Sequence, residues 1–181
     1  MTSISRTEET AGPAADGAHY RDAMSRMGSS VTIVTSAGPA GPAGFTATAV
    51  ASVSDDPPTI LVCVNRASRS HGPLTMNGVF CINVLADGMA DLAEIFAGRG
   101  LPDGADTVEE RFAHGEWARL ATGSAVLVGA VAAFDCRISE IVPVATHDIV
   151  IGVVQAVRSD ASGEPLVYAA RRYRAIDPVR L

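Results

Sequence analysis

A dense group of hydrogen-bond donors follows an apolar run in the first half of this chain. The apolar run is Thr59–Val64. The donors belong to the next segment: Asn65, Arg66, Ser68, Arg69 and Ser70. Guanidinium, amide and hydroxyl groups suit an anionic phosphate, because each can donate a hydrogen bond to a phosphate oxygen. The alternative is an ordinary solvated loop, which is what a cluster of charged side chains usually forms.

Small and hydroxyl-bearing residues precede this donor loop, in the segment Gly44–Ser54. They include these candidate ligand contacts: Thr46, Ala47, Thr48 and Ser52. The turn-forming segment Asp55–Pro58 ends the run, so we expect a strand, a tight corner, a second strand and then the donor loop. Small side chains let a flat group lie against the backbone, and a flat ring beside a phosphate has the shape of flavin mononucleotide (FMN). A strand packed closely on a neighbour would have the same composition.

His147 stands just before an apolar run and is the histidine best placed to meet a ligand. A single histidine is more often structural or exposed than functional, so its position alone decides nothing. The other histidines and the three cysteines lack the spacing of metal ligands, and we expect no metal site. No arrangement typical of a nucleophilic hydrolase or of a zinc protease is present.

Two weaker candidate sites lie further along the chain. The first consists of Phe96, Gly98 and Arg99. It falls at the expected end of a helix, where a cation is favourable without any ligand. The second is the basic cluster Arg171–Arg174, which includes Arg172 and Tyr173. A solvated surface near the C-terminus would have the same composition.

Composition and charge exclude several classes of protein. The chain has 181 residues, 14 Lys and Arg against 20 Asp and Glu, and a net charge of −6. An acidic chain without a basic run does not favour nucleic acid or an anionic membrane. The cysteines Cys63, Cys81 and Cys136 form no CxxC motif and fit small core residues in a reducing compartment. The N-terminus lacks the apolar core of a signal peptide, and Ala125–Phe134 is too short to span a bilayer, so we expect a soluble, cytoplasmic protein.

The pattern of elements predicts an all-β dominated fold with a few short helices. Residues 1–18 are small and polar and are expected to form a disordered tail, with one domain over residues 19–181. Short helices are expected at Tyr20–Met27, at His71–Met76 and between Asp87, as the capping residue, and Gly98. Further strands are expected at Val31–Thr35, Val79–Leu85, Ser124–Val144, Asp148–Val157 and Leu166–Tyr168, and the stretch Ser124–Val144 is expected to kink at Gly129 and Pro143. Since the strands do not alternate with helices and no GxGxxG motif follows a strand, an antiparallel barrel is favoured over a Rossmann fold.

Six segments in the same order resemble the flavin reductase family, the small NAD(P)H:flavin oxidoreductases that serve two-component flavin monooxygenases. They are YRDAMSRMGSSVTIVTS, GFTATAVASVSDDPP with LVCVNRASRS, FCINVLADGMADLAEIFAG, LVGAVAAFDCRI, THDIVIGVV and PLVYAARRYRAI. Within the family, the stretches DAMSRMG, GPAGPAGFTA, LVCVNR, FDCRIS and THDI are most similar to the FMN reductase of pyrimidine catabolism.

The resemblance implies an FMN-binding split β-barrel of Greek-key, antiparallel type, and a homodimer with flavin near the subunit interface. It implies FMN or FAD as the flavin and NADH or NADPH as the hydride donor. Because these cofactors carry the chemistry, no nucleophile or general base is expected from the protein.

The resemblance also implies roles for the candidate residues. The segment with Thr46, Ala47, Thr48 and Ser52 would meet the isoalloxazine ring and the ribityl chain through backbone N–H groups. The donor loop would bind the phosphate, and Phe96, Gly98 and Arg99 would add a phosphate or adenine contact. His147 would shape the nicotinamide side as the catalytic residue, with Asp148 orienting it or merely starting a strand. Tyr173 with Arg172 would close over the dinucleotide. Ala145 stands where the family commonly has Gly.

The expected function is a reductase that supplies reduced flavin to a separate flavin-dependent monooxygenase. Two alternatives remain open from the sequence. One is a non-catalytic flavin carrier or sensor on the same barrel. The other is a split-barrel reductase of another bound oxidant, in which flavin stays in place as a fixed cofactor.

Overall fold

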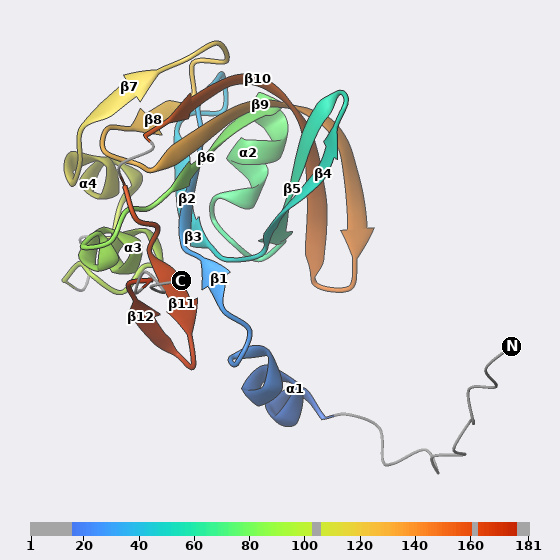
Figure 1. Ribbon diagram of the computed structural model, residues 1–181. Helices are drawn as coiled ribbons and strands as arrows, with labels where there is room; N and C mark the ends of the chain where they lie inside the picture. The colour runs from blue at the N-terminus through green and yellow to red at the C-terminus, as the bar shows by residue number, and fades with distance from the viewer. Residues whose placement is uncertain (1–15, 103–105, 161–162, 177–181) are drawn as a thin grey trace, which may run out of the picture.

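A curved antiparallel sheet of seven strands organises the chain. The computed structural model describes residues 16–102, 106–160 and 163–176. The sheet has the order β3-β2-β6-β9-β10-β5-β4 (Figure 1). Its strands are β2 (Thr32–Ser36), β3 (Ala43–Ala47), β4 (Val50–Asp55), β5 (Pro58–Asn65), β6 (Val79–Val84), β9 (Ala132–Val144) and β10 (His147–Ser159). The neighbours β2 and β6, and β10 and β5, are distant in sequence, as in a Greek key and not in a simple meander. The predicted antiparallel β class is confirmed.

Strand β2 separates the two main parts of the core. All five of its residues are buried, because both faces of the strand are covered. Ile33 belongs to a cluster with Phe96 and Leu127, whereas Val34 belongs to a cluster with Phe80 on the opposite side. Side chains alternate between the faces of a strand, so consecutive apolar residues serve both clusters.

The long hairpin of β9 and β10 arches across the molecule and forms one wall of the barrel (Figure 1). Gly152 lies where β10 crosses Phe80, and a Cβ atom there would stand 2.6 Å from the Phe80 ring. Only glycine at this position of β10 leaves room for the Phe80 ring, which belongs to β6. Helix α2 (His71–Asn77) packs against the concave side of the sheet through Leu74, which is fully buried.

Short elements surround the sheet. The helices are α1 (Gly17–Met24), α3 (Ala90–Phe96) and α4 (Val108–Ala113). A small sheet consists of β1 (Ser29–Ser30), β11 (Val167–Ala169) and β12 (Arg172–Arg174), and a hairpin consists of β7 (Trp117–Arg119) and β8 (Ala125–Leu127). Helix α1 has no buried residue and stands apart from the barrel (Figure 1). No helix in the described ranges is long and apolar enough to cross a membrane.

The small-residue segment after Gly44 is two strands, and the prediction of a single strand is wrong. Strand β3 pairs with β2, while β4 pairs with β5 at the opposite edge of the sheet. The chain leaves the ladder at Thr48 and Ala49 to pass from one edge to the other. Thr48 and Ala49 therefore line the opening between the two edges of the barrel.

Helix boundaries also differ from the predictions. Asp87 does not cap α3, because the helix begins at Ala90 with Met89 as its N-cap residue. The backbone N–H of Asp87 donates to Glu164 O at 2.8 Å and holds the chain against the C-terminal segment. Helix α1 begins at Gly17 with Asp16 as its N-cap, so it starts before the predicted Tyr20. The expected disordered tail lies outside the described residues as far as residue 15.

One helix was missed, and one expected strand is broken at Gly129, where the sequence predicted a kink. Helix α4 was not predicted, although Thr107 caps it by accepting from Glu110 N, the start of a capping box. The expected strand Ser124–Val144 is broken between β8 and β9, where Gly129 has a φ of 84°.

Candidate flavin site

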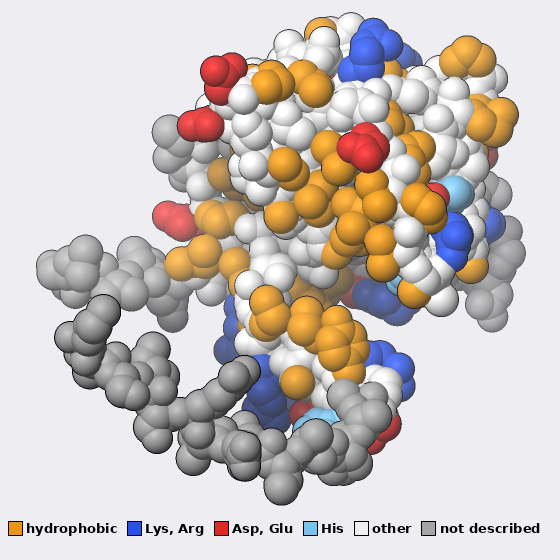
Figure 2. Space-filling model, turned by 90° about the vertical axis from the view of Figure 1, so that its right-hand side faces the viewer, with side chains coloured by type: hydrophobic (Ala, Val, Ile, Leu, Met, Phe, Trp, Pro, Cys, Tyr) orange, Lys and Arg blue, Asp and Glu red, His pale blue; other side chains and the backbone are white. Residues whose placement is uncertain are grey.

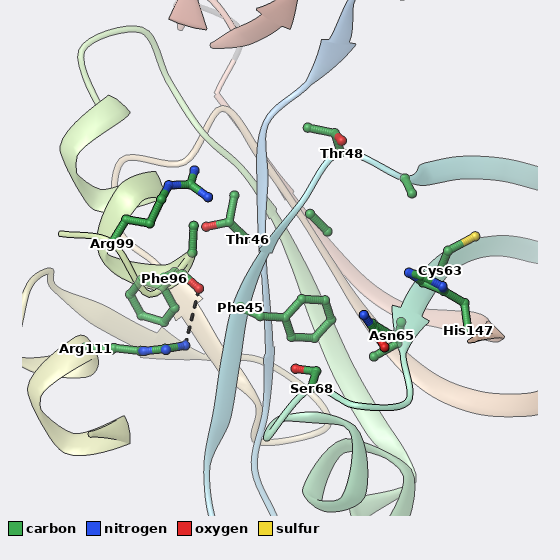
Figure 3. Close-up of a pocket in the computed structure, with 14 residues that line it drawn as sticks. Phe45, Thr46, Thr48, Cys63, Asn65, Ser68, Phe96, Arg99, Arg111 and His147 are labelled. Atoms are coloured by element: carbon green, nitrogen blue, oxygen red, sulfur yellow. Dashed lines mark hydrogen bonds between the residues drawn. The ribbon is translucent and has the colours of Figure 1, made fainter. Parts of the chain in front are cut away.

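A pocket of about 380 Å³ lies at the opening between β3 and β5 (Figure 3). Segments distant in sequence line it: the end of β3, the end of β5 with the donor loop, the end of α3, and the start of β10. Its lining residues are Phe45, Thr46, Ala47, Thr48, Ala49, Cys63, Val64, Asn65, Ser68, Phe96, Ala97, Arg99, Arg111 and His147. This volume lies in the range typical of small-molecule sites.

Strand β3 forms one wall of the pocket as an edge strand of the sheet. Edge strands carry backbone N–H and C=O groups that no neighbouring strand uses, so they can bind a flat polar ring. The hydroxyl of Thr46 donates to Ala93 O at 2.6 Å and fixes the strand to α3. A Cβ atom on Gly44 would stand 2.6 Å from Cε1 of Phe96, so only glycine lets the Phe96 ring lie against this strand.

The donor loop is held in one shape by internal hydrogen bonds. Asn65 Oδ1 accepts from Ala67 N at 2.9 Å, which is the turn that short polar side chains make with their own backbone. Ser70 Oγ donates to Gly44 O at 3.1 Å and ties the loop to the start of β3. Asn65 and Ser68 line the pocket, whereas Ser70 is buried at the base of the loop.

Both arginines of the donor loop are paired with carboxylates away from the pocket. Arg66 Nε lies 3.9 Å from Asp148 Oδ1, and Arg66 N donates to Thr146 O at 3.1 Å. Arg69 forms an ion pair with Asp106 and also donates to its backbone oxygen at 3.1 Å. Neither side chain lines the main pocket. Phosphate binding by these arginines stays a prediction.

Arg99, Glu94 and Tyr173 form a hydrogen-bonded cluster on the α3 side of the pocket. Arg99 donates twice to Glu94, at 2.7 Å each, and Tyr173 OH donates to the same carboxylate at 2.6 Å. The Arg99 hydrogen bonds, followed by that from Tyr173, lower the pKa of Glu94 to about 2. Burial and the bond to Glu94 raise the pKa of Tyr173 to about 12. A smaller hollow of about 210 Å³ lies beside this cluster and shares Thr46 and Arg99 with the main pocket.

Arg111 is a pocket residue that the sequence did not reveal. Its guanidinium donates to Asp106 at 2.6 and 2.8 Å and to Phe96 O at 3.3 Å, where Figure 3 shows it below the Phe96 ring. Hydrogen bonds from Arg111, with a smaller contribution from Arg69, lower the pKa of Asp106. The capping pattern of α4 could have placed Arg111 on a helix, but not its partner.

His147 lies on the side of the pocket opposite Arg99 and Phe96, next to Cys63 (Figure 3). Its Nδ1 atom is 2.9 Å from Thr146 Oγ1. Asp148 does not orient it, because Asp148 is bonded to another histidine: Asp148 Oδ2 is 2.7 Å from Nε2 of His71. That expectation is corrected, since neighbours along a strand point to opposite faces of the sheet.

The structure thus gathers eight of the sequence-predicted residues around one pocket: Thr46, Ala47, Thr48, Asn65, Ser68, Phe96, Arg99 and His147. It places Ser52, Arg66, Arg69, Ser70, Gly98 and Arg172 outside that pocket, and Tyr173 in the adjoining hollow. Ser52 lies out of reach because β4 follows the opposite edge of the sheet. Gly98, with a φ of 76°, ends α3. The sequence missed Phe45, Ala49, Cys63, Val64, Ala97 and Arg111. Within the described residues there is no cluster of histidine, cysteine and carboxylate side chains able to hold a metal ion.

A split β-barrel with a pocket beside an edge strand and a donor loop defines a class of flavin-handling proteins. The chain belongs to the family of the flavin reductase like domain, whose model matches residues 24–177. The fold is therefore the split-barrel type that the sequence predicted.

Individual relatives are similar over most of their length. The chain is 50% identical over 164 residues to the FMN reductase (NADH) RutF of Ancylobacter novellus, covering 91% of this chain and 87% of that protein. The NADH:FAD oxidoreductase SgcE6 of Streptomyces globisporus, solved with NAD and FAD fragments, superimposes with a TM-score of 0.82 at 29% identity, covering 96% of this chain and 99% of that one. BorF, the flavin reductase component of a bacterial two-component tryptophan halogenase, gives a TM-score of 0.79 at 33% identity, covering 89% and 98%.

Proposed function

We propose that this chain is an NADH-dependent FMN reductase that supplies reduced flavin to a separate flavin-dependent monooxygenase. The observation that carries the proposal is the pocket that joins the edge of β3, the donor loop and His147. The name of the relative that is 50% identical supports FMN and NADH as the first pair to test. FAD remains the alternative flavin, and a cytoplasmic location stays a prediction from the sequence.

The residues of the pocket fit a flavin without supplying chemistry of their own. When bound, flavin supplies the acceptor atom for hydride and the nicotinamide supplies the hydride. Backbone groups of β3 from Phe45 to Ala47 would bind the polar edge of the ring. The side chains of Asn65 and Ser68 would meet the ribityl chain or the phosphate. His147 would hold the nicotinamide on the other side of the ring and donate a hydrogen bond to it.

The charges around the pocket support a flavin that is released after each turnover. Arg99 and Arg111 line the pocket, but each already has a carboxylate partner: Arg99 has Glu94, and Arg111 has Asp106, which it shares with Arg69. A guanidinium that already has a carboxylate partner gains less from a phosphate than a free one. We therefore expect the phosphate of FMN to contribute modestly to binding, as suits a flavin that acts as a diffusible substrate.

A homodimer is part of this proposal. The face at the right of Figure 1 shows hydrophobic side chains gathered in its middle (Figure 2). A groove of about 650 Å³ has apolar lining residues from α1, the turn after α1, β4 and β5, among them Met24, Met27 and Leu61. It shares Thr48 and Cys63 with the flavin pocket. A second copy covering this groove would close the open side of the pocket, and light scattering should therefore report a dimer.

Anaerobic turnover tests the main proposal. The protein is mixed with excess FMN, and separately with FAD, and NADH or NADPH is added while the visible absorbance of oxidised flavin is followed. Bleaching of many equivalents of FMN by NADH is the expected result. Binding without bleaching would favour the carrier or sensor. Bleaching of a single equivalent would favour a fixed cofactor that awaits another oxidant.

The role of His147 can be tested in the same assay. His147→Ala should slow flavin reduction roughly tenfold to hundredfold, because the nicotinamide would lose its orientation. The Kd for FMN should change much less. Equal losses in rate and in FMN binding would place His147 against the flavin instead. His114→Ala, which changes an exposed histidine at the end of α4, is the matched control.

A further inference from the structure

Asp148 lies next to the flavin pocket, and only one of its two carboxylate oxygens has a hydrogen-bond partner among the described residues. Asp148 is 7% exposed and follows His147 at the start of β10. One of its oxygens, Oδ2, is 2.7 Å from His71 Nε2. The other, Oδ1, is buried and accepts no hydrogen bond within the described residues. A buried carboxylate oxygen without a donor is costly, so its surroundings call for an explanation.

The nearest cation to this oxygen belongs to the donor loop. Arg66 Nε stands 3.9 Å from Asp148 Oδ1, which is ion-pair distance but too long for a hydrogen bond. The Arg66 side chain is 46% exposed, so it has room to move. A shift of about 1 Å would complete the hydrogen bond. The backbone of Arg66 is already fixed to the β9–β10 turn by its bond to Thr146 O.

The two side chains that face Asp148, Arg66 and His71, mark the two ends of the loop. Arg66 follows Asn65, the last residue of β5, and His71 is the first residue of α2. Between them lies Ser68, which lines the flavin pocket together with Asn65. Asp148 therefore holds both ends of the segment whose middle would contact the flavin.

We infer that Asp148 is a positioning residue for flavin binding, and that Arg66 and His71 act through it to hold the loop 65–70 against the pocket. This inference rests on the proposed function, because it assigns the loop to flavin. It also changes the role expected for Arg66. The sequence suggested a phosphate ligand, whereas the geometry makes Arg66 a latch between the loop and β10.

The two roles of Arg66 predict different results with FMN and riboflavin, which lacks the phosphate. A phosphate ligand matters for FMN alone. A latch places Asn65 and Ser68 and therefore matters for both flavins. Binding is measured by titrating protein into each flavin and following flavin fluorescence, so the test does not depend on turnover by NADH.

Arg66→Ala should raise the Kd of both flavins about tenfold, the size expected for one charge-assisted hydrogen bond. Asp148→Asn weakens both ends of the loop and should raise both Kd values at least as much. The double variant should bind no more weakly than Asp148→Asn alone, because the Arg66 contact is already lost there. Arg137→Ala, which removes an exposed arginine from β9, is the matched control and should leave both Kd values unchanged.

The His71 end of the loop is tested by a conservative and a disruptive change. His71→Gln keeps a donor near Asp148 Oδ2 and should keep most of the affinity, whereas His71→Ala should lose about tenfold for both flavins. The temperature midpoint of unfolding is measured for every variant. In steady state, where the wild type turns over, KM for flavin should rise while kcat changes little.

Three results with the variants would overturn the inference about Asp148. Weakened FMN binding with normal riboflavin binding in Arg66→Ala would make Arg66 a phosphate ligand. Lower thermal stability of Asp148→Asn with unchanged Kd values would make the carboxylate purely structural. Additive losses in the double variant would separate Arg66 from Asp148.

The wild type distinguishes failure of this inference from failure of the proposed function. A wild type that binds both flavins without NADH reducing them would refute the proposed reductase but not the role of Asp148 and Arg66 in holding the loop. A wild type that binds neither flavin would refute both.

Discussion

Two buried aspartates lie in the paired strands β9 and β10, and they differ in how many of their oxygens accept hydrogen bonds. Asp135 of β9 is 0% exposed, and both of its carboxylate oxygens accept hydrogen bonds from Thr122. Thr122 N donates to it at 2.7 Å, and the Thr122 hydroxyl contacts the other oxygen. Asp148 has one oxygen bonded to His71 and the other without a donor.

The partners of the two carboxylates explain this difference. Asp135 holds the turn between β7 and β8 through Thr122, and Asn83 separately holds β8 by accepting from Leu127 N at 2.8 Å. Both oxygens of Asp135 are thus satisfied within the protein. Asp148 faces a loop that borders a pocket, and its second partner is a half-exposed arginine. The carboxylate of Asp135 has both oxygens satisfied within the protein, whereas Asp148 holds the loop through His71 and keeps its second oxygen available for Arg66.

The largest expected effect belongs to the closed network. Asp135→Ala should lower the free energy of unfolding by about 3 kcal/mol, because two hydrogen bonds to a fully buried carboxylate are lost and the half-buried Thr122 N loses its acceptor. Urea unfolding measures the change. The Kd for FMN of the folded fraction should be normal. Thr122→Ser, which keeps both donors, is the control and should cost far less. A loss below about 1 kcal/mol in Asp135→Ala would mean that the network adds little to stability.

A smaller change in the free energy of unfolding is expected at the β9–β10 turn, which precedes Asp148. Ala145 has a φ of 49°, a left-handed conformation that favours glycine. Ala145→Gly should stabilise the protein by about 0.5–1 kcal/mol, since relief of strain exceeds the added chain entropy. Ala170, with a φ of 52° in the β11–β12 turn, offers a matched change far from Asp148. Both substitutions should raise the unfolding midpoint in urea alike.

This pair of substitutions separates backbone strain from the carboxylate. FMN affinity should be unchanged in both variants, because the bond from Arg66 N to Thr146 O and the strand register hold His147 and Asp148 in place. Weaker FMN binding in Ala145→Gly alone would mean that the strained turn, and not the carboxylate, positions the loop. The Asp148 inference would then lose its support.

The sequence predicted the local features of this molecule well. Apolar and β-branched runs identified most strands of the sheet, because strand formation follows their alternation and the turns between them. Gly98 was placed correctly after a helix, since glycine is favoured where φ is positive. Ala145 was recognised as a departure from glycine, and its φ of 49° shows why glycine is favoured there.

The features that escaped prediction depend on partners distant in sequence. Nothing in the donor loop indicates that Arg66 faces Asp148 or that Arg69 faces Asp106, because ion pairs are chosen by the folded neighbourhood. The division of the small-residue segment at Thr48 and Ala49 has no glycine or proline to mark it. Asp87 was expected to cap a helix, but α3 begins only at Ala90, and the backbone of Asp87 instead forms a tertiary hydrogen bond with Glu164 O. The roles of the site residues stay predictions for the same reason.

A third carboxylate, Glu94, tests which property makes a carboxylate stabilising: having both oxygens hydrogen-bonded, or being buried. Glu94 accepts from Arg99 and Tyr173, so both of its oxygens are occupied, as in Asp135. Its side chain is 33% exposed, however, and water screens the pair. If burial decides how much a carboxylate stabilises the protein, Glu94→Gln should lower the free energy of unfolding by less than about 1 kcal/mol at neutral pH. This is far below the loss expected for Asp135→Ala.

The pH dependence of that small cost follows from the pKa of Glu94. The folded protein holds this pKa at about 2, below the ordinary value of 4.5. The stabilisation is therefore fully present above pH 4.5 and is lost as the pH falls toward 2, where the carboxyl binds a proton in both states. The difference in unfolding free energy between the wild type and Glu94→Gln should shrink over this interval, while Glu140→Gln, an exposed position on β9, serves as the control. A cost as large as that of Asp135→Ala would show that occupied oxygens matter more than burial, and the contrast between the two buried aspartates would then rest on their donors alone.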